Sequence, residues 1–508
     1  QYYWLRQLDE TIAAENQMAY RFNQGVPNQV TYRLPTWSRN SITQLHGVYI
    51  QDQYTRNRLT LSGALRWDRA SSYAPVEGNG VAVASRFNAA PITIEQTPGV
   101  DAYNDLSPRF GVGYDVFGNG KTALKLRWGR YLGFASNDQP YTSTNPAATL
   151  VATVARSWTD TNGNKVVDCD LLNFDANGEC AVLTGNSRNF GRIGAATVVD
   201  PDLLKGWGVR THDYQTEVTL QQELLPRVSA ELSYIHRTFH GFFVTENLNR
   251  DPQTDWASYT ITAPSDARLP EGGGYPIQVF VPTRGGAAQN YMTWEENFGN
   301  GQERDSSYDG INVNINARMA NGFFVSAGTS TGRNIVDDCH VVVNMNNGNT
   351  GPNPRGCRDV DPWRTTLRGL ASYTIPKIDV LVSAIMRSEP PLEIGADWRV
   401  PNSVVRDLLG FLPIGTNPRG NTVIALDDPE HRIFADNRRT QIDMRFAKIV
   451  RIGGTRTDIG VDLNNLFNTN YATNYEDDFE PDVANDLWAT PTSIYPPRFV
   501  RLNFTVNF

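Results

Sequence analysis

The segment from Asp160 to Asp170 carries oxygen-bearing side chains at the spacing of a calcium-binding loop. Counted from Asp160, oxygen ligands stand at positions 1, 3, 5 and 9 and are followed by a further carboxylate, the set being Asp160, Asn162, Asn164, Asp168 and Asp170. Ca²⁺ prefers carboxylate and amide oxygens, so the pattern predicts a Ca²⁺ site in the 160–170 loop. The match is incomplete, because Gly163 occupies position 4 rather than 6, and Leu171 stands where a bidentate Glu is usual. Asp170 would have to substitute for that Glu, and a turn rich in Asn, Asp and Gly explains the same sequence.

The cysteines form two pairs that are local in sequence, Cys169 with Cys180 and Cys339 with Cys357. Each pair lies in a polar segment rich in Asn and Gly. Four cysteines allow three connectivities, and we favour the two local disulfides, which are typical of an oxidising compartment. Free thiols or a metal site are the alternative, although the spacing is not that of a zinc finger and His340 is the only nearby histidine at ligand spacing.

Tryptophans in the long polar segments are candidates for ligand binding, because aromatic faces stack on sugars and contact peptides. The candidates are Trp158, Trp207, Trp256, Trp294, Trp398 and Trp488. Long loops also use aromatic side chains to pack against one another, and for any single tryptophan we favour packing over ligand binding.

Catalytic chemistry has little basis in this sequence, and we predict that the protein is not an enzyme. His236 and His240 are four residues apart but lie on or just beyond a predicted strand, where that spacing does not form the helical zinc pair. Gly-x-Ser-x-Gly occurs at 328–332, but inside the predicted 304–334 hairpin and not at the strand-to-helix turn of a nucleophile elbow, and no phosphate loop is present. The net charge of −8 argues against the concentrated basic face of a nucleic-acid-binding protein. No run of about 18 apolar residues predicts a transmembrane helix.

Two-residue periodicity, which indicates β-strands, dominates the 508 residues. In the clearest case Val500, Leu502 and Phe504 alternate with Arg501 and Asn503. We predict hairpins near 44–69, 104–134, 211–241, 304–334, 363–390 and 438–467, a final strand at 497–508, and an earlier strand near 14–24. That makes about fourteen strands of about 10 residues or more, and a membrane-spanning strand needs about 9–11.

Short and long connections alternate along the predicted strands. Short turns are predicted at Arg56-Asn57, Gly118-Asn119-Gly120, Leu225-Pro226, Asn321-Gly322, Pro376-Lys377 and Gly453-Gly454. Long segments are predicted at 70–103, 135–210, 242–303, 335–362, 391–437 and 468–496. The alternation predicts an all-β, antiparallel, up-and-down barrel in the bacterial outer membrane, with short periplasmic turns, long extracellular loops and a periplasmic C-terminus.

The strand face opposite the apolar one carries charges that suit a water-filled lumen. The predicted lumen-facing charges are Arg109, Asp115, Lys125, Arg127, Asp443 and Arg445. A soluble β-sandwich or propeller is the alternative, but its strands average about 5–6 residues. Six long loops are also unusual there, because structureless loops beyond about 12–15 residues are uncommon.

Five segments together resemble the barrel of TonB-dependent outer-membrane receptors, and most closely the Oar-like group with a carboxypeptidase-regulatory-like domain. They are Tyr49-Ile50-Gln51-Asp52-Gln53-Tyr54 with Leu59-Thr60-Leu61, Leu106-Ser107-Pro108-Arg109-Phe110-Gly111-Val112, Gly120-Lys121-Thr122-Ala123-Leu124-Lys125, Asp462-Leu463-Asn464-Asn465-Leu466-Phe467-Asn468, and Pro497-Arg498-Phe499 before the terminal strand. The resemblance implies a transporter that takes up a small solute such as an oligosaccharide, peptide or metal chelate. Its loops would capture the ligand, and the TonB complex would supply energy through an N-terminal plug.

The resemblance also implies a 22-stranded barrel, so that residues 1–508 would form its C-terminal portion. About eight strands, the plug and the TonB box would then lie outside this chain, which begins with Gln1 rather than Met. The alternatives are a passive channel closed by fourteen strands and a loop-rich surface scaffold or adhesion platform.

The terminal Phe508 resembles the signal that the barrel-assembly machinery reads on a final strand. An interfacial aromatic residue beside the outer-membrane lipid is the alternative.

Overall fold

The computed structural model describes residues 2–11, 17–34, 37–78, 86–87, 90–194, 197–286, 288–346, 351–414, 416–452, 455–483 and 486–507. Within them the largest sheet has 19 strands. Fourteen of these strands have nine or more residues: β1 (Tyr2–Thr11), β4 (Trp37–Arg56), β5 (Leu59–Ala74), β9 (Ala102–Asp115), β10 (Thr122–Leu132), β14 (His212–Leu225), β15 (Val228–His240), β20 (Asp305–Arg318), β21 (Phe324–Asp337), β23 (Arg364–Ile375), β24 (Val380–Glu389), β27 (Arg439–Ile452), β28 (Thr455–Asn464) and β32 (Phe499–Asn507). The five short members are β6 (Glu77–Gly78), β7 (Thr93–Ile94), β8 (Thr97–Pro98), β13 (Lys205–Trp207) and β22 (Arg358–Val360).

The long strands follow one another in chain order, and each pairs antiparallel with the next. The registers run from β1 with β4 through β20 with β21 to β28 with β32. This is the predicted up-and-down arrangement. The six predicted hairpins and the final strand are confirmed.

The predicted first strand near 14–24 is wrong as a member of this sheet. The first long strand is β1, which pairs with β4 over ten residue pairs from Tyr2–His46 to Thr11–Trp37. Residues 12–16 lie outside the described part of the chain, and Met18–Asn23 forms β2, a strand of a separate small sheet. Tyr20 and Phe22 alternate with Arg21 as in a wall strand, but β2 has only six residues and pairs with β3 instead of the wall.

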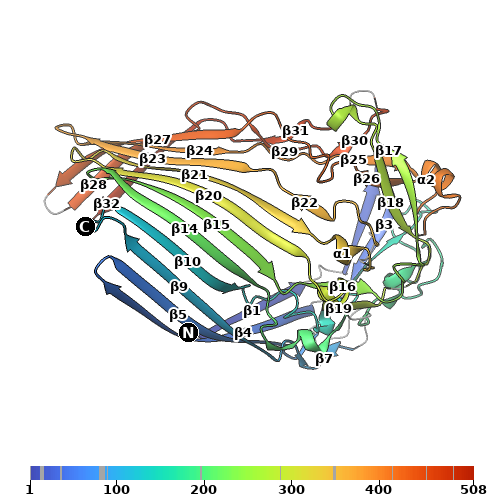
Figure 1. Cartoon of the computed structure of the whole chain (residues 1–508). Coiled ribbons are helices and arrows are strands. Elements are labelled where there is room, and N and C mark those ends of the chain that lie inside the picture. The colour runs from blue at the N-terminus through green and yellow to red at the C-terminus, as the bar shows by residue number, and fades with distance from the viewer. Residues whose placement is uncertain are drawn as a thin grey trace.

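The two ends of the sheet differ as the connections predict. Short turns such as 57–58, 226–227 and 376–379 lie together at one end, and the long loops gather at the other (Figure 1). The predicted turn at Gly453-Gly454 lies outside the described residues. We call the two ends the turn end and the loop end.

The loops contain their own small sheets and short helices. The strands are β2 (Met18–Asn23), β3 (Val26–Arg33) and β11 (Thr153–Ser157); β12 (Val198–Val199), β16 (Phe243–Asn247) and β19 (Asn290–Trp294); β17 (Trp256–Thr262) and β18 (Pro276–Pro282); β25 (Asp397–Pro401), β26 (Asn421–Ala425) and β30 (Asp478–Phe479); β29 (Ala472–Tyr475) and β31 (Pro491–Ile494). The α-helices are α1 (Cys339–Val342) and α2 (Asn402–Leu409), and 3-10 turns span Pro146–Thr149, Gly185–Asn189, Pro201–Leu203, Pro270–Gly272 and Glu295–Asn297. No helix in the described part of the chain is both long and apolar enough to cross a membrane.

The long strands present one apolar and one polar face. On β20 the exposed side chains Ile311, Val313 and Ile315 alternate with Asn312 and Asn314. The apolar face continues across the sheet in exposed side chains that include Leu65, Phe110, Leu126, Leu232, Phe446 and Leu502. An alternation of this kind is what a strand needs between lipid and a polar interior.

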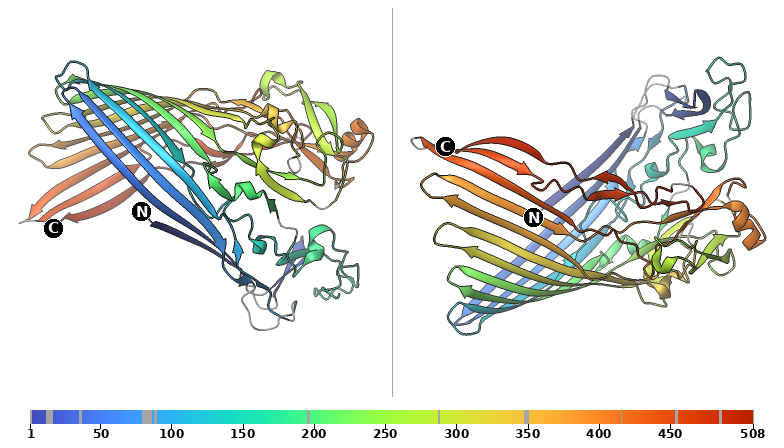
Figure 2. Two further views of the ribbon diagram at one scale, coloured as in Figure 1. Left: turned by 60° about the horizontal axis from the view of Figure 1, so that its bottom comes forward. Right: turned by 90° about the horizontal axis from the view of Figure 1, so that it is seen from above.

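The sheet curves into an open trough, with β1 and β32 at its two edges (Figure 2). Within the described residues, β1 has a register with β4 and β32 has a register with β28, and none joins β1 to β32. A row of backbone N–H and C=O groups is therefore exposed along each edge.

Candidate functional site

The two largest hydrophobic cores in the described part of the chain lie at the loop end, each built from loops that are distant in sequence. We call the first loop core A; its members include Tyr32 and Leu34 from the β1–β4 connection and Trp158, Leu171 and Phe190 from the β10–β14 connection. Strands β2, β3 and β11 form its sheet. The Tyr32 hydroxyl donates to the Leu171 carbonyl at 3.0 Å, which joins the two connections.

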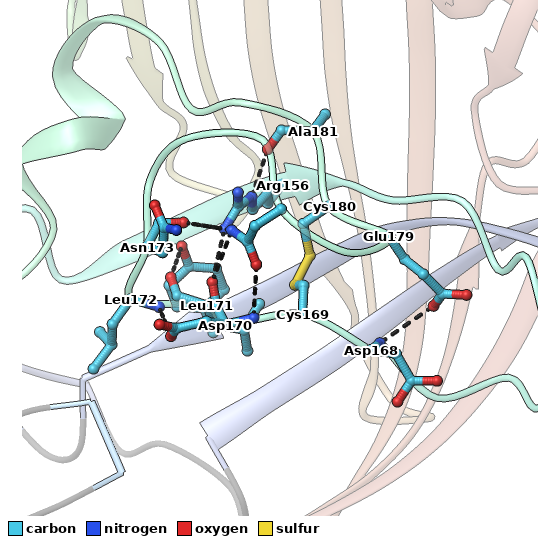
Figure 3. The surroundings of a disulfide bond; sticks show 12 residues. Arg156, Asp168, Cys169, Asp170, Leu171, Leu172, Asn173, Glu179, Cys180 and Ala181 are labelled. Atoms are coloured by element: carbon cyan, nitrogen blue, oxygen red, sulfur yellow. Dashed lines mark hydrogen bonds between the residues drawn. A yellow bond between two sulfur atoms is a disulfide. The ribbon is translucent and has the colours of Figure 1, made fainter.

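Arg156 is the buried centre of loop core A, with 2% of its surface exposed. Its Nε donates to the carbonyl of Ala181 at 2.6 Å, Nη1 donates to that of Asn173 at 2.9 Å, and Nη2 donates to that of Asp175 at 2.6 Å. The disulfide between Cys169 and Cys180 closes the same segment (Figure 3). A buried guanidinium is stable only when its donors find acceptors, and here loop carbonyls supply them.

The second core, loop core B, joins three other connections. Its members include Tyr259 and Ile277 from the β15–β20 connection, Val405 from the β24–β27 connection, and Phe479 and Trp488 from the β28–β32 connection. The Trp488 indole N–H donates to the Gly395 carbonyl at 2.7 Å. These loops come from three different connections and pack against one another in loop core B. Their packing therefore fixes the shape of the loop end.

Ion pairs join the β21–β23 connection to the β24–β27 connection, which contributes to loop core B. The Arg432 guanidinium contacts the carboxylates of Asp359, Asp361 and Glu393, the last two at 3.1 Å and 2.8 Å. The second disulfide, Cys339–Cys357, lies in this connection. Both favoured cysteine pairs are therefore confirmed, and free thiols or a metal at these cysteines are excluded.

The six candidate tryptophans do not share one binding surface. Trp158 and Trp488 are 3% and 2% exposed and fill loop cores A and B, so the ligand-binding interpretation is wrong for both and the packing alternative holds. Trp398 packs against loop core B and Trp294 against a small cluster around Met292. Trp256 is half-buried with Arg250 over its ring, which leaves Trp207, 66% exposed, as the open aromatic surface.

The predicted calcium loop brings four of its five candidate ligands together. Both Asn162 and Asn164 donate side-chain N–H groups to Asp168 Oδ2, at 2.6 and 2.8 Å. Asp160 accepts the backbone N–H groups of Gly163 and Lys165, at 2.8 and 3.0 Å. Lys165, at position 6, has φ of 61°, the left-handed conformation that calcium loops usually obtain from Gly.

The fifth candidate, Asp170, points elsewhere, because its Oδ1 accepts the Leu172 N–H at 3.0 Å. Glu179, which the sequence analysis missed, lies beside the loop: Oε1 accepts the Thr161 N–H at 2.6 Å and Oε2 accepts the Asp168 N–H at 3.2 Å. Hydrogen bonds from Thr161 hold the pKa of Glu179 below its usual range. No group of three His, Cys, Asp or Glu side chains is placed to hold a metal within the described ranges, so any ion here would depend on the Asn amide oxygens.

Calcium binding by this loop stays a prediction with a direct test. We expect titration calorimetry of the purified protein to show Ca²⁺ binding in the range of extracellular modules, about 10⁻⁴–10⁻³ M. Asp168→Asn should abolish the heat, whereas Asp175→Asn, in an exposed part of the same loop, should leave it unchanged. Absence of heat in the unmutated protein would identify the segment as a hydrogen-bonded turn without a metal.

The six predicted lumen charges lie on the polar face of the sheet, and one of them, Asp115, caps a turn. Arg127 pairs with Glu217 at 3.5 Å, Lys125 donates to Gln221 at 2.7 Å, and the Arg109 guanidinium lies 4.3 Å from the centre of the Tyr131 ring. Arg109 and Arg127 also line one surface hollow of the sheet, together with Gln51 and Tyr131.

At the other edge, Arg445 donates to Asn503 at 2.7 Å and Asp443 accepts the Asn465 N–H at 2.7 Å. Asp115 shares the polar face by alternation, but its carboxylate accepts the Gly118 and Gly120 N–H groups at 2.9 and 2.8 Å. It therefore caps a turn rather than lining the wall.

Comparison with solved structures finds outer-membrane transporters of low sequence identity. The outer membrane transporter YddB from Escherichia coli gives a TM-score of 0.46 at 8% identity, over 93% of this chain and 55% of that one. The ferric-catecholate import receptor Fiu from E. coli K12 gives 0.43 at 11%, over 99% and 54%. The siderophore receptor PiuA from Acinetobacter baumannii gives 0.39 at 9%, over 94% and 44%. The chain thus spans about half the length of these proteins, and a search of curated proteins finds no match.

A family model, described as the outer membrane beta barrel domain, matches residues 7–377. This range is more than half of the chain and contains the strands from β4 to β23. It also contains both disulfides and the whole of the 160–170 loop. This chain belongs to the outer membrane beta barrel domain family.

Proposed function

We propose that this chain is the barrel wall of a TonB-dependent transporter that takes up a small solute across the outer membrane. The observation that carries the proposal is the open trough: the described residues form fourteen long strands with one apolar and one polar face, and among those residues the edge strands β1 and β32 do not pair with each other. An exposed strand edge has no hydrogen-bond partners in lipid. Further strands would close the barrel, and a plug would fill a lumen of that width.

The loop end supports ligand capture on the extracellular side. Loop cores A and B and two disulfides hold long connections in a defined shape, which a surface exposed to the medium requires. In this orientation the short turns and the C-terminus are periplasmic, where the TonB complex would act through a segment outside this chain. The polar inner wall would face the plug and the solute.

The intact mass of the native protein, extracted from outer membranes and mapped by N-terminal peptides, tests the proposal. We expect a mass well above that of 508 residues, with peptides upstream of Gln1. We also expect no steady conductance in planar bilayers, because a plug would block the lumen. A mass equal to that of 508 residues, together with steady conductance independent of TonB, would replace the proposal with the passive channel.

Phe508 lies outside the described residues, and its role as an assembly signal stays a prediction. Deleting Phe508 should lower the amount of folded protein in the outer membrane, because the assembly machinery would no longer read the final strand. Quantitative immunoblots of heat-modifiable protein measure the effect, and Phe508→Tyr, which keeps a terminal aromatic residue, is the control. Unchanged levels without Phe508 would leave only an interfacial role.

A further inference from the structure

A cavity of about 230 Å³ lies at the loop end, where the segment after β10 folds over β9 and the start of β14. Thr43 and Ser72, which face each other on β4 and β5, fix that segment. The Thr43 hydroxyl donates to the Asn137 side chain at 2.6 Å, and the Ser72 hydroxyl donates to the Tyr141 carbonyl at 2.7 Å. Residues that line the cavity include Tyr103, Phe134, Asp138, Tyr141, Arg210 and Phe243.

Arg210 is a buried cation with two donor nitrogens that are unsatisfied within the described residues. Its side chain lines the cavity, 6% of the residue is exposed, and neither Nε nor Nη1 has an acceptor among the described residues. The Asp105 carboxylate pairs with Arg130 at 3.3 Å, and no ion pair links Asp105 to Arg210 in the same described set. The charge of Arg210 interacts with the Asp105 carboxylate, but leaving buried donors without acceptors is costly, and an anionic group bound in the cavity would supply acceptors for Nε and Nη1.

Tyr141 supplies a second donor to the same space. Its hydroxyl is buried without a partner, and burial raises the pKa of Tyr141 to about 12, so the phenol stays protonated. Tyr103, in contrast, is satisfied, because its hydroxyl donates to the Leu203 carbonyl. Arg210 and Tyr141 are therefore the two unsatisfied donors, and a carboxylate would accept from both.

The rest of the lining disfavours a simple anion. The exposed residue Asp138 also lines the cavity, and its negative charge opposes a ligand that carries only negative charge. A ligand with a carboxylate and an ammonium group satisfies both charges. Phe134 and Phe243 supply aromatic surface for an apolar body of the ligand.

We propose that this cavity binds a free α-amino acid with a large apolar side chain. Its carboxylate accepts from Arg210 and Tyr141, its ammonium group donates to Asp138, and its side chain lies against the aromatic wall. The inference names a solute class for the transporter proposed above and rests on that proposal for its physiological meaning. Binding itself needs neither TonB nor transport, so the two proposals can fail separately.

Titration calorimetry of the full-length protein in detergent, with L-phenylalanine as the probe, tests the site. We expect L-phenylalanine to bind and both L-phenylalaninamide and 3-phenylpropionate to bind at least about tenfold more weakly, because each lacks one charge–charge contact. Equal affinity for 3-phenylpropionate would overturn the zwitterion proposal. Absence of heat from all three probes at 10 mM, with folding confirmed by melting, would overturn the site.

Matched variants locate the binding at Arg210. Arg210→Gln should weaken L-phenylalanine binding at least about tenfold. Arg188→Gln, at an arginine in the same connection whose side chain is 45% exposed, should not weaken it. Asp138→Asn should weaken binding of L-phenylalanine but not of 3-phenylpropionate. Should Arg210→Gln fail to fold, the three probes on the unmutated protein decide the question alone; unchanged binding by a folded Arg210→Gln protein would overturn the assignment.

Discussion

Replacing Val313 with arginine is expected to destabilise the folded protein by about 2–4 kcal/mol, because a charge near the middle of the lipid-facing surface is desolvated. Val313 lies near the middle of β20, is exposed, and belongs to the apolar face with Ile311 and Ile315. Equilibrium unfolding of the full-length protein in phospholipid vesicles measures the loss. The same variant should also lower the folded fraction recovered from outer membranes.

The neighbouring position Asn314 provides the matched control. Asn314 lies on the polar face, opposite Glu231 on β15, so an arginine there remains hydrated and has a carboxylate partner. Asn314→Arg should therefore change the unfolding free energy by less than about 1 kcal/mol. Equal destabilisation by the two substitutions would show that the faces have been assigned wrongly.

Replacing Arg156 with methionine is expected to open loop core A at a cost of about 3 kcal/mol or more, because the hydrogen bonds of its charged guanidinium to three loop carbonyls are lost. Those carbonyls belong to Asn173, Asp175 and Ala181. Native-state hydrogen exchange should show faster exchange across 150–190, whereas the long strands should keep their protection. Local opening of this kind is measurable because loops and wall form separate cooperative units.

Arg188→Met is the control for Arg156→Met. Arg188 lies in the same connection and pairs with Asp175 at 3.0 Å, but both side chains are largely exposed. An exposed ion pair of this type contributes about 0–1 kcal/mol. Wild-type exchange rates in Arg156→Met would show that the disulfide and the apolar contacts hold loop core A without the guanidinium.

Much of the wall could be predicted from sequence because alternation is a local property. The strand from Val500 to Phe504, for example, shows its two faces without reference to any neighbour. The disulfides were predictable for a similar reason, since each joins cysteines only 11 or 18 residues apart. The lumen charges followed from alternation too, although the turn-capping role of Asp115 depends on the geometry of residues 116–120.

The candidate sites were less predictable because they depend on contacts between distant loops. Trp158 and Trp488 are of a residue type that often contacts ligands, but their burial in loop cores A and B makes them packing residues. Four calcium-loop residues follow from sequence spacing, whereas Glu179 enters through the fold of the disulfide-closed segment. Arg156 and Arg210 gave no sequence signal, since a single arginine in a polar loop is most often exposed.

By itself, the sequence determined the positions of thirteen of the fourteen long strands, the two faces of the wall, the alternation of short turns with long loops and the cysteine pairs. Each of these depends on residue types a few positions apart. The tertiary structure decided which strand begins the wall, because β1 pairs with β4 of the wall whereas β2 pairs with β3 of a small loop sheet. It also decided that, among the described residues, the trough stays open between β1 and β32 and Arg210 lines a cavity with two unsatisfied donor nitrogens. The physical reason is that pairing and burial are set by groups far away along the chain, which local periodicity does not encode.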